Sequence, residues 1–195
     1  MRIGVLASGE GTNLQALLDD PEIEVVAVAS DKPDARALER GRAAGVAAES
    51  FTGYDERADR DRAIVAWLRE QDVELVVLAG YMQLLSDGFL GAFPQRVINV
   101  HPALLPAFPG LGAVQQALDY GVKVFGVTVH FVDGGVDTGP VILQRAVELP
   151  EAHTEDEVLD QLHPIEHELL PAAVRLIARG AVKVEGRRVV VESAS

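Results

Sequence analysis

The sequence contains no cysteine, which excludes disulfide bonds, cysteine-ligated metal sites and thiol catalysis. Positive charge is also scarce, because 17 Lys and Arg residues stand against 30 Asp and Glu residues and leave a formal net charge of -13. A protein with that charge repels polyanions, so we expect no nucleic-acid partner. Any bound phosphate group is expected to be held by backbone N–H groups rather than by a cluster of cationic side chains.

Long hydrophobic runs are absent as well. No segment approaches the length that crosses a membrane, and the apolar stretch at residues 1–6 is too short for a signal peptide. We therefore expect a cytoplasmic protein with no membrane partner. The 195 residues suffice for a substantial core. No repeat, low-complexity tract or linker divides them, so we expect a single domain over residues 1–195.

Alternating strand and helix patterns predict the fold class. Apolar runs at residues 3–7, 24–29 and 75–79 are typical of strands covered on both faces of a parallel sheet. Between these runs, residues 34–45 and 56–71 carry apolar side chains at helical spacing. This order predicts an α/β protein with a doubly wound, Rossmann-like sheet and helices on both of its faces.

In the second half of the chain the alternation of strand and helix patterns stops. Residues 123–132 and 141–149 are expected to form consecutive strands, so the central sheet should be mixed but mostly parallel. A closing hairpin is expected from strands at residues 182–184 and 188–191.

One predicted strand ends in two side chains that suit acyl transfer. Residues 96–98 form an apolar run, and Asn99 and His101 follow it two residues apart. On an extended strand both side chains point the same way. An amide N–H and an imidazole together can stabilise an oxyanion and transfer a proton. The alternative is a strand-end turn in which Asn99 bonds to the backbone and His101 is partly exposed.

A carboxylate that can orient His101 lies in the glycine-rich segment at residues 132–140. Asp137 is the candidate, although Asp-Thr-Gly-Pro is also ordinary turn chemistry. Ligands of open α/β sheets bind outside the carboxyl ends of the strands, where both segments are expected. Two other histidines are interpreted differently: His130 as a hydrogen-bonded sheet residue, and His153 as a solvated residue before a helix.

The first predicted strand leads into a glycine-containing turn at residues 8–15. Thr12 to Gln15 fits a capping box that opens a helix. Glycines at a helix N-terminus expose N–H groups that can bind phosphate, but the spacing matches neither a dinucleotide motif nor a P-loop. An ordinary strand-to-helix turn is the alternative. The carboxylate of Glu10 would have to point away from a bound anion.

Residues 163–167, His-Pro-Ile-Glu-His, match the H-x-x-E-H signature of some zinc peptidases. The helix that carries them is expected to begin with a capping box at residues 154–157 and to end at Gly180. Pro164 should kink or divide this helix and bias His163 away from the helical conformation, which spoils the zinc geometry. We therefore expect no metal site.

Taken together, these residues resemble the phosphoribosylglycinamide formyltransferase family, purine-pathway enzymes that use 10-formyltetrahydrofolate. The resemblance covers almost the whole chain and is carried by residues 7–15, 77–82, 99–106, 108–110, 127–132 and 137–142. Asn-x-His-Pro with the later Asp marks the wider folate formyltransferases, and the Gly-x-Gly-Thr-Asn loop indicates this branch. The family fold implies that residues of about 1–100 bind the phosphate. Residues of about 101–195 would hold folate and the catalytic loop.

The resemblance also implies a role for individual residues. The catalytic trio would be Asn99, His101 and Asp137. The amine substrate would be bound by Gly11, Thr12, Asn13, Glu166 and His163. The folate co-substrate would be bound by Arg57, Tyr81, Met82, Gln83, Leu84, Leu85, Val132 and Gly135. By residue type alone, Met82, Leu84 and Leu85 indicate either core or the wall of a flat apolar pocket. Neither a metal ion nor ATP is expected, and the protein should act on small molecules as a monomer or homodimer.

Three short segments depart from the family pattern. Gly112-Ala113-Val114 stands where relatives often carry His-Thr-His, Ala107 where a basic residue is common, and Gln83 where arginine is usual. Side-chain contacts to substrate and folate are therefore expected to differ here.

Three other functions remain to be distinguished. A methionyl-tRNA formyltransferase needs an additional tRNA-contacting domain and a basic face, and we expect neither. A formyltetrahydrofolate hydrolase shares the catalytic trio but normally lacks the glycine phosphate loop. A non-catalytic sensor would bind both small molecules and transfer nothing.

Overall fold

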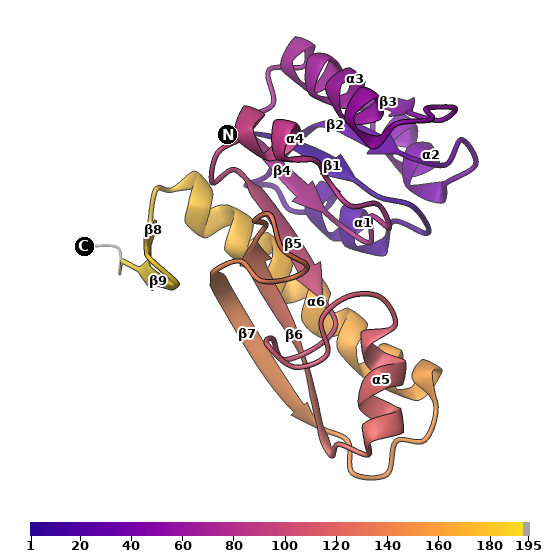
Figure 1. The fold of residues 1–195 in the computed structure, drawn as a ribbon, viewed down its shortest axis with the longest axis vertical. Coiled ribbons are helices and arrows are strands. Elements are labelled where there is room, and N and C mark those ends of the chain that lie inside the picture. Colours follow the sequence, from indigo (N-terminus) through magenta and orange to yellow (C-terminus); the bar gives the residue numbers. More distant parts are fainter. Residues whose placement is uncertain (193–195) are drawn as a thin grey trace. The chain divides into compact units, whose positions relative to one another are not determined.

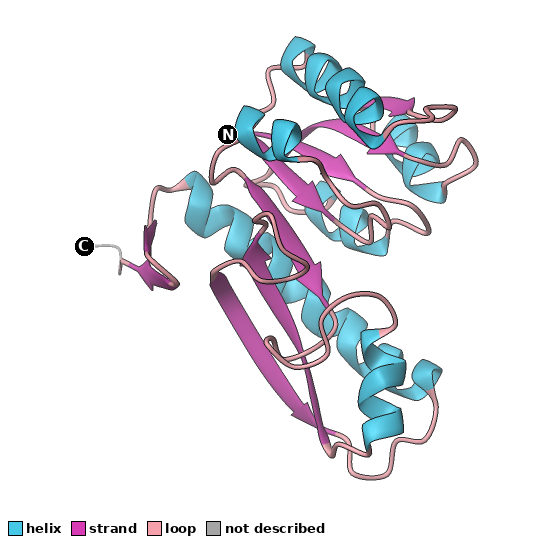
Figure 2. Cartoon of the chain, in the orientation of Figure 1, coloured by secondary structure: helices cyan, strands magenta, loops and turns pink. Residues whose placement is uncertain are grey.

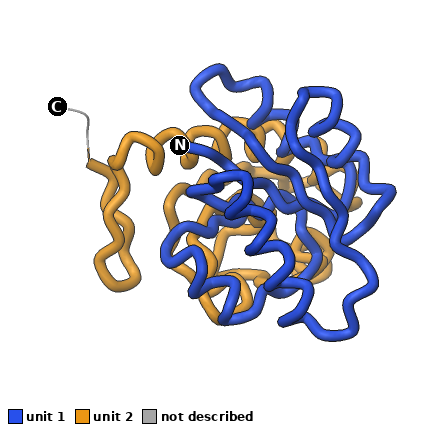
Figure 3. Tube along the Cα trace, turned by 90° about the horizontal axis from the view of Figure 1, so that it is seen from above, with its two compact units in different colours: residues 1–99 blue, residues 100–195 orange. Residues whose placement is uncertain are grey.

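Seven strands form one mostly parallel sheet in the order β3-β2-β1-β4-β5-β6-β7, and a two-stranded sheet pairs β8 with β9. The computed structural model describes residues 1–192. Two compact units, residues 1–99 and 100–195, are coloured separately in Figure 3. The predicted α/β class and the mixed, mostly parallel sheet are confirmed.

The first unit holds the parallel strands and four helices (Figure 1). The strands are β1 (Arg2–Leu6), β2 (Glu24–Ser30), β3 (Ala47–Ser50), β4 (Leu75–Leu78) and the start of β5 (Val97–His101). The helices are α1 (Thr12–Leu18), α2 (Arg36–Ala43), α3 (Arg57–Glu70) and α4 (Asp87–Ala92). The strands predicted at residues 3–7, 24–29 and 75–79 and the helices predicted at residues 34–45 and 56–71 are confirmed within about two residues, the usual uncertainty of element ends.

Burial explains why β4 and residues 3–6 of β1 are apolar. Every residue of β4 is buried, and so are residues 3–6 of β1. Helices α3 and α4 pack side by side, as do α1 and α2, and the two pairs lie on opposite faces of the strands (Figure 1). Strands with both faces covered need apolar side chains at every position.

The strand order reverses between β1 and β4, which pair in parallel. Open α/β sheets bind ligands outside the carboxyl ends of the strands at such a reversal. The segments that leave these two ends are residues 7–11 and 79–86. The fold therefore places the predicted phosphate loop and the predicted folate segment at the position where this architecture binds ligands.

The second unit is built on the antiparallel strands β6 (Val124–Phe131) and β7 (Val141–Glu148), as predicted (Figure 2). Its other elements are α5 (Ala113–Tyr120), α6 (Glu155–Ala178), β8 (Val182–Glu185) and β9 (Arg188–Val191). Helix α6 packs against β6, β7 and α5. The closing hairpin of β8 and β9 is confirmed.

Helix α6 corrects one prediction. Its capping box is present, because the Thr154 side chain accepts from the N–H of Glu157 and the Glu157 side chain accepts from the N–H of Thr154. However, the helix continues through Pro164 and Pro171, so the expected division at Pro164 is wrong. Each proline removes one backbone hydrogen bond. The apolar face of α6 that packs against the sheet outweighs that loss. Within residues 1–192, every helix is too short or too polar to cross a lipid bilayer.

Candidate active site

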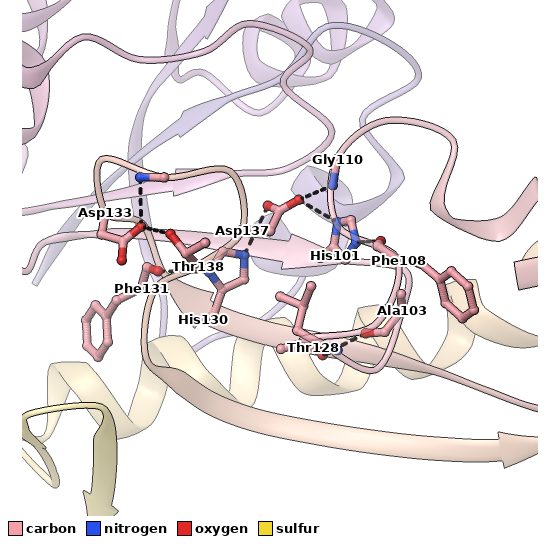
Figure 4. A network of polar contacts seen from close by, with 12 residues as sticks. His101, Ala103, Phe108, Gly110, Thr128, His130, Phe131, Asp133, Asp137 and Thr138 are labelled. Atoms are coloured by element: carbon pink, nitrogen blue, oxygen red, sulfur yellow. Dashed lines mark hydrogen bonds and ion pairs between the residues drawn. The ribbon is translucent and has the colours of Figure 1, made fainter. Parts of the chain in front are cut away.

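Asp137 lies at the centre of a polar cluster in the second unit (Figure 4). Its Oδ2 atom is 3.4 Å from Nδ1 of His101 and accepts a 2.8 Å hydrogen bond from the backbone N–H of Gly110. Its Oδ1 atom is 3.4 Å from Nε2 of His130. One carboxylate thus contacts two imidazoles and a backbone amide. The predicted meeting of His101 and Asp137 is present in the structure.

Strand ends and a tight turn bring these groups together. His101 is the last residue of β5, and His130 is the last but one of β6. Asp137 lies in the connection from β6 to β7 and adopts a left-handed backbone with φ of 52°. Aspartate tolerates this region better than most residues. The interpretation of Asp137 as a turn residue and its place beside His101 are therefore both correct.

Two further contacts fix the turn that carries Asp137. Asp133 accepts hydrogen bonds at Oδ1 from the N–H of Gly135 and from the Thr138 hydroxyl (Figure 4). A Cβ atom on Gly139 would lie 1.8 Å from the carbonyl oxygen of Phe131, so only glycine fits there. The loop is therefore held against the end of β6 by its own side chains and by close backbone contact.

The remaining ring nitrogens define how the histidines are held. Nε2 of His101 lies 2.8 Å from the carbonyl oxygen of Phe108, and Nδ1 of His130 lies 2.8 Å from that of Phe131. A carbonyl oxygen only accepts hydrogen bonds, so both of these nitrogens donate. The opposite nitrogen of each ring faces Asp137. Each imidazole therefore has an oxygen atom near both of its ring nitrogens.

Asp137 is a stable anion in this setting. Burial by itself would raise its pKa, but the hydrogen bond from His130, the N–H of Gly110 and the charges of both histidines lower the pKa to about 2. The carboxylate is therefore ionised at neutral pH.

Asn99 occupies the predicted place on the same strand as His101. It is half-buried in β5, one residue before Val100. Residues two apart on a strand share a face. Strand geometry therefore predicts Asn99 and His101 on one side of β5, and an amide and an imidazole placed together can stabilise an oxyanion.

The predicted phosphate loop follows β1 in the first unit, and one expectation about it is wrong. Gly11, not a side-chain cap, precedes α1, with φ of 72° and no capping hydrogen bond, so Thr12 to Gln15 form no capping box. A Cβ atom on Gly11 would lie 2.8 Å from Cα of Ala37, so the left-handed glycine is required by α2 beneath it. The carboxylate of Glu10 turns aside to Arg36, at 2.7 Å.

The predicted folate segment, residues 81–85, follows β4. Met82 and Leu84 are 53% and 59% exposed, so of the two interpretations the core is wrong for both. Leu85 is half-buried and Gln83 is exposed. Burial raises the pKa of Tyr81 to about 12 against the opposing charge of Arg60, and the phenol oxygen is buried without a hydrogen-bond partner among the described residues.

The other predicted ligand-binding residues are found on three elements. Arg57 is exposed at the start of α3, while Val132 and Gly135 lie half-buried and exposed in the loop that carries Asp137. Glu166 is buried on α6, and His163 is half-buried on the same helix.

The H-x-x-E-H motif adopts a geometry that the sequence did not predict. The rings of His163 and His167 stack with centroids 6.3 Å apart on the continuous helix α6, so Pro164 does not separate them. Burial and then the neighbouring His163 lower the pKa of His167. In residues 1–192 no three His, Cys, Asp or Glu side chains are arranged to hold a metal ion.

His130 is the member of the cluster whose role the sequence did not reveal. The prediction of a hydrogen-bonded sheet histidine is confirmed by the contact of Nδ1 with the Phe131 carbonyl, and the other ring nitrogen contacts the carboxylate of Asp137. The signal for this pairing is weak. His130 is one residue from the end of its strand, and Asp137 is in the loop that follows, a spacing that many strand–turn segments share.

Comparison with known proteins agrees with this geometry. Residues 1–174 match the family described as formyl transferase. The phosphoribosylglycinamide formyltransferase of Bacillus subtilis is 40% identical over 89% of this chain and 93% of its own length. The trifunctional purine biosynthetic protein adenosine-3 of Bos taurus is 39% identical over 94% of this chain, which is 19% of that longer protein.

A solved structure gives the same result. Glycinamide ribonucleotide transformylase 1 from Symbiobacterium toebii superposes with a TM-score of 0.96 at 49% identity, covering 99% of this chain and 94% of its own. The family match spans most of the chain, and the Bacillus relative is matched over nearly its full length. The chain therefore belongs to the formyltransferase family, in its phosphoribosylglycinamide formyltransferase branch.

Proposed function

We propose that this protein transfers the formyl group of 10-formyltetrahydrofolate to the amine of 5'-phosphoribosylglycinamide, a step of purine biosynthesis. The observation that carries the proposal is the 3.4 Å pair of His101 and ionised Asp137 in a chain of the formyltransferase family. The products are the N-formyl compound and tetrahydrofolate. Because the formyl group is already activated on the folate nitrogen, the proposed reaction uses neither a metal ion nor ATP.

In the proposed mechanism, the amine nitrogen attacks the formyl carbon and the formyl oxygen becomes an oxyanion. The Asn99 amide and an N–H of His101 stabilise that oxyanion. Nε2 of His101 donates to the carbonyl oxygen of Phe108 in the structure. The same N–H would donate to the oxyanion when that oxygen replaces the Phe108 carbonyl as its acceptor.

Collapse of the intermediate breaks the bond between the formyl carbon and the folate nitrogen, which keeps the electron pair. The attacking amine loses one proton and the folate nitrogen gains one, so the step balances. Asp137, with a pKa of about 2, does not retain this proton. Its proposed role is to hold His101 in its charged form and to pass the amine proton towards the folate nitrogen through water.

The ligand-binding residues are assigned within the same proposal. Backbone N–H groups of Gly11, Thr12 and Asn13 would bind the phosphate, which suits a chain with a net charge of -13. Glu166 and His163 would bind the rest of the amine substrate. Folate would be bound by Arg57, Tyr81, Met82, Gln83, Leu84, Leu85, Val132 and Gly135. The protein would act on these small molecules in the cytoplasm, as a monomer or homodimer.

The decisive experiment combines purified protein, 10-formyltetrahydrofolate and phosphoribosylglycinamide without metal or ATP. Mass spectrometry should detect equal amounts of N-formyl product and tetrahydrofolate. Release of formate in place of the formylated amine would identify a hydrolase. Binding of both compounds with no conversion would identify a sensor. Either of these results would contradict the proposed function.

A further inference from the structure

Arg60 of α3 is a buried arginine that reaches the predicted folate segment. Its side chain is 10% exposed. Nη1 donates to Oε1 of Gln83 at 3.1 Å, and Nη2 donates to the backbone carbonyl of Leu84 at 2.9 Å. The guanidinium also lies 6.0 Å from the ring centroid of Tyr81. The guanidinium of Arg60 therefore contacts the side chain of Gln83 and the backbone of Leu84.

The neighbouring residue Asp61 completes the contact. Its Oδ1 atom accepts from Arg60 at 2.7 Å, and its Oδ2 atom accepts from the backbone N–H of Ser86 at 2.6 Å. The Asp61 side chain is only 1% exposed. The charge of Arg60 is paired with that of Asp61, so Arg60 is not available as a cation for a ligand.

A second set of contacts holds the other end of the segment. Gln83 donates from Nε2 to Oδ2 of Asp31 at 2.9 Å. The Ser8 hydroxyl donates to Oδ1 of Asp31 at 2.5 Å and accepts from the N–H of Met82 at 2.9 Å. Residues 82–86 are therefore held by side chains from the segment after β1, from the residue after β2 and from α3.

These contacts hold the backbone of residues 82–86 and leave the apolar side chains of Met82 and Leu84 exposed. Met82 and Leu84 remain exposed while the backbone at both positions is hydrogen-bonded to buried or half-buried side chains. An apolar surface fixed before binding loses less conformational entropy when a ligand covers it. A flat ring system is the ligand chemistry that such a surface fits.

Gln83 is matched to Arg60. Its amide accepts from Arg60 at the oxygen and donates to Asp31 at the nitrogen, so it uses both polar atoms. The arginine usual in the family at this position has no acceptor and would place a second cation against Arg60. The presence of glutamine rather than arginine at position 83 is therefore explained by its hydrogen bond with the buried Arg60 of α3.

We infer that Arg60 is a positioning residue which, through Gln83 and Leu84, sets the conformation of residues 82–86 and thereby the affinity for the folate co-substrate. The inference rests on the proposed function for the identity of the ligand. It adds a role for two side chains on α3 and a reason for the unusual residue at position 83.

The test compares Arg60→Lys with Arg62→Lys, the same substitution at an exposed arginine of the same helix that pairs with Asp59. Lysine keeps the charge beside Asp61 but lacks the planar guanidinium that donates to both Gln83 and Leu84. We expect Arg60→Lys to raise KM for 10-formyltetrahydrofolate about tenfold, the effect of one lost charged hydrogen bond. KM for the amine substrate and kcat should stay within about twofold. Arg62→Lys should leave all three constants unchanged.

A second variant covers the case in which Arg60→Lys does not fold. Gln83→Arg lies on the surface and restores the usual family residue, and we expect it to weaken folate binding about tenfold because of repulsion from Arg60. Calorimetric titration with tetrahydrofolate reports binding without turnover. Wild-type folate affinity in Gln83→Arg, or equal constants for Arg60→Lys and Arg62→Lys, would overturn the inference. Failure of the wild type to transfer a formyl group would instead overturn the proposed function.

Discussion

Nε2 of His130 and Oδ1 of Asp137 lie 3.4 Å apart, so His130 contacts the carboxylate oxygen that His101 does not. The carboxylate is thereby held from two sides, and its orientation toward His101 depends on a histidine that need not touch substrate. His130 is accordingly a positioning residue for the proposed catalytic pair.

Replacement of His130 by glutamine should slow the reaction without weakening binding. Loss of one charged hydrogen bond corresponds to about 10- to 100-fold in kcat, with KM for both substrates little changed. Steady-state kinetics measure this split. His153→Gln, the same change at the histidine before α6, serves as the control and should be silent. A large rise in KM with normal kcat would make His130 a binding residue instead.

Asn99→Ala and His101→Ala each remove a proposed oxyanion donor. Loss of one preorganised donor typically costs roughly 100- to 1000-fold in rate, so we expect kcat of either variant to fall at least that far. Circular dichroism should show a folded protein in both cases. Near-normal turnover by either variant would rule out its proposed role.

Asp137→Asn separates catalysis from binding. Asparagine keeps the shape of the side chain but removes the negative charge that, in the proposed mechanism, acts on His101. We expect slow formyl transfer with unchanged folate affinity, measured by single-turnover kinetics and by titration with tetrahydrofolate. An equal loss of transfer and of affinity would show that Asp137 acts mainly in binding.

The low pKa of Asp137 also predicts how stability depends on pH. The pKa is about 2 in the folded protein and 3.8 in its ordinary setting. The ionised carboxylate therefore adds stability that is present above pH 3.8 and is lost as pH falls towards 2. This contribution should decrease from about 2 kcal/mol at pH 6 to about 1 kcal/mol at pH 3.

Urea unfolding of the wild type and of Asp137→Asn at pH 6 and pH 3 measures this pH-dependent difference. The wild type should lose its advantage as the pH falls. A stability difference that stays constant between the two pH values would mean that the carboxylate gains nothing from its neighbours.

The sequence predicted those elements whose patterns are long and continuous. Buried apolar runs such as β4 and residues 3–6 of β1 leave little ambiguity. The elements β3, α4 and α5 were not predicted, because they are short and lack a continuous apolar run. At Pro164 a local rule failed, since packing of α6 on the sheet outweighs the loss of one hydrogen bond.

The site shows the same division. His101 and Asp137 could be paired from the sequence because parallel α/β folds bring strand ends to one edge. The contact of Asp137 with His130 could not, because it depends on a loop folding back over β6, and spacing does not encode that path. The contacts of Gln83 were equally hidden, because they join side chains from segments far apart in the sequence.

Gly139 tests whether that loop path matters for the reaction. A Cβ atom there would lie 1.8 Å from the carbonyl oxygen of Phe131, so Gly139→Ala must displace backbone and shift Asp137, two residues earlier. We expect a loss of about 2 kcal/mol in the free energy of unfolding and a lower kcat at unchanged affinity for the amine substrate.

Gly91→Ala in α4 is the matched control, since a Cβ atom there meets nothing within 4 Å and alanine favours a helix by roughly 0.5–1 kcal/mol. Urea unfolding should therefore show lower stability for Gly139→Ala and higher stability for Gly91→Ala. Steady-state kinetics should show a lower kcat only for Gly139→Ala. Wild-type kcat in a destabilised Gly139→Ala would show that Asp137 keeps its place beside His101 without this turn.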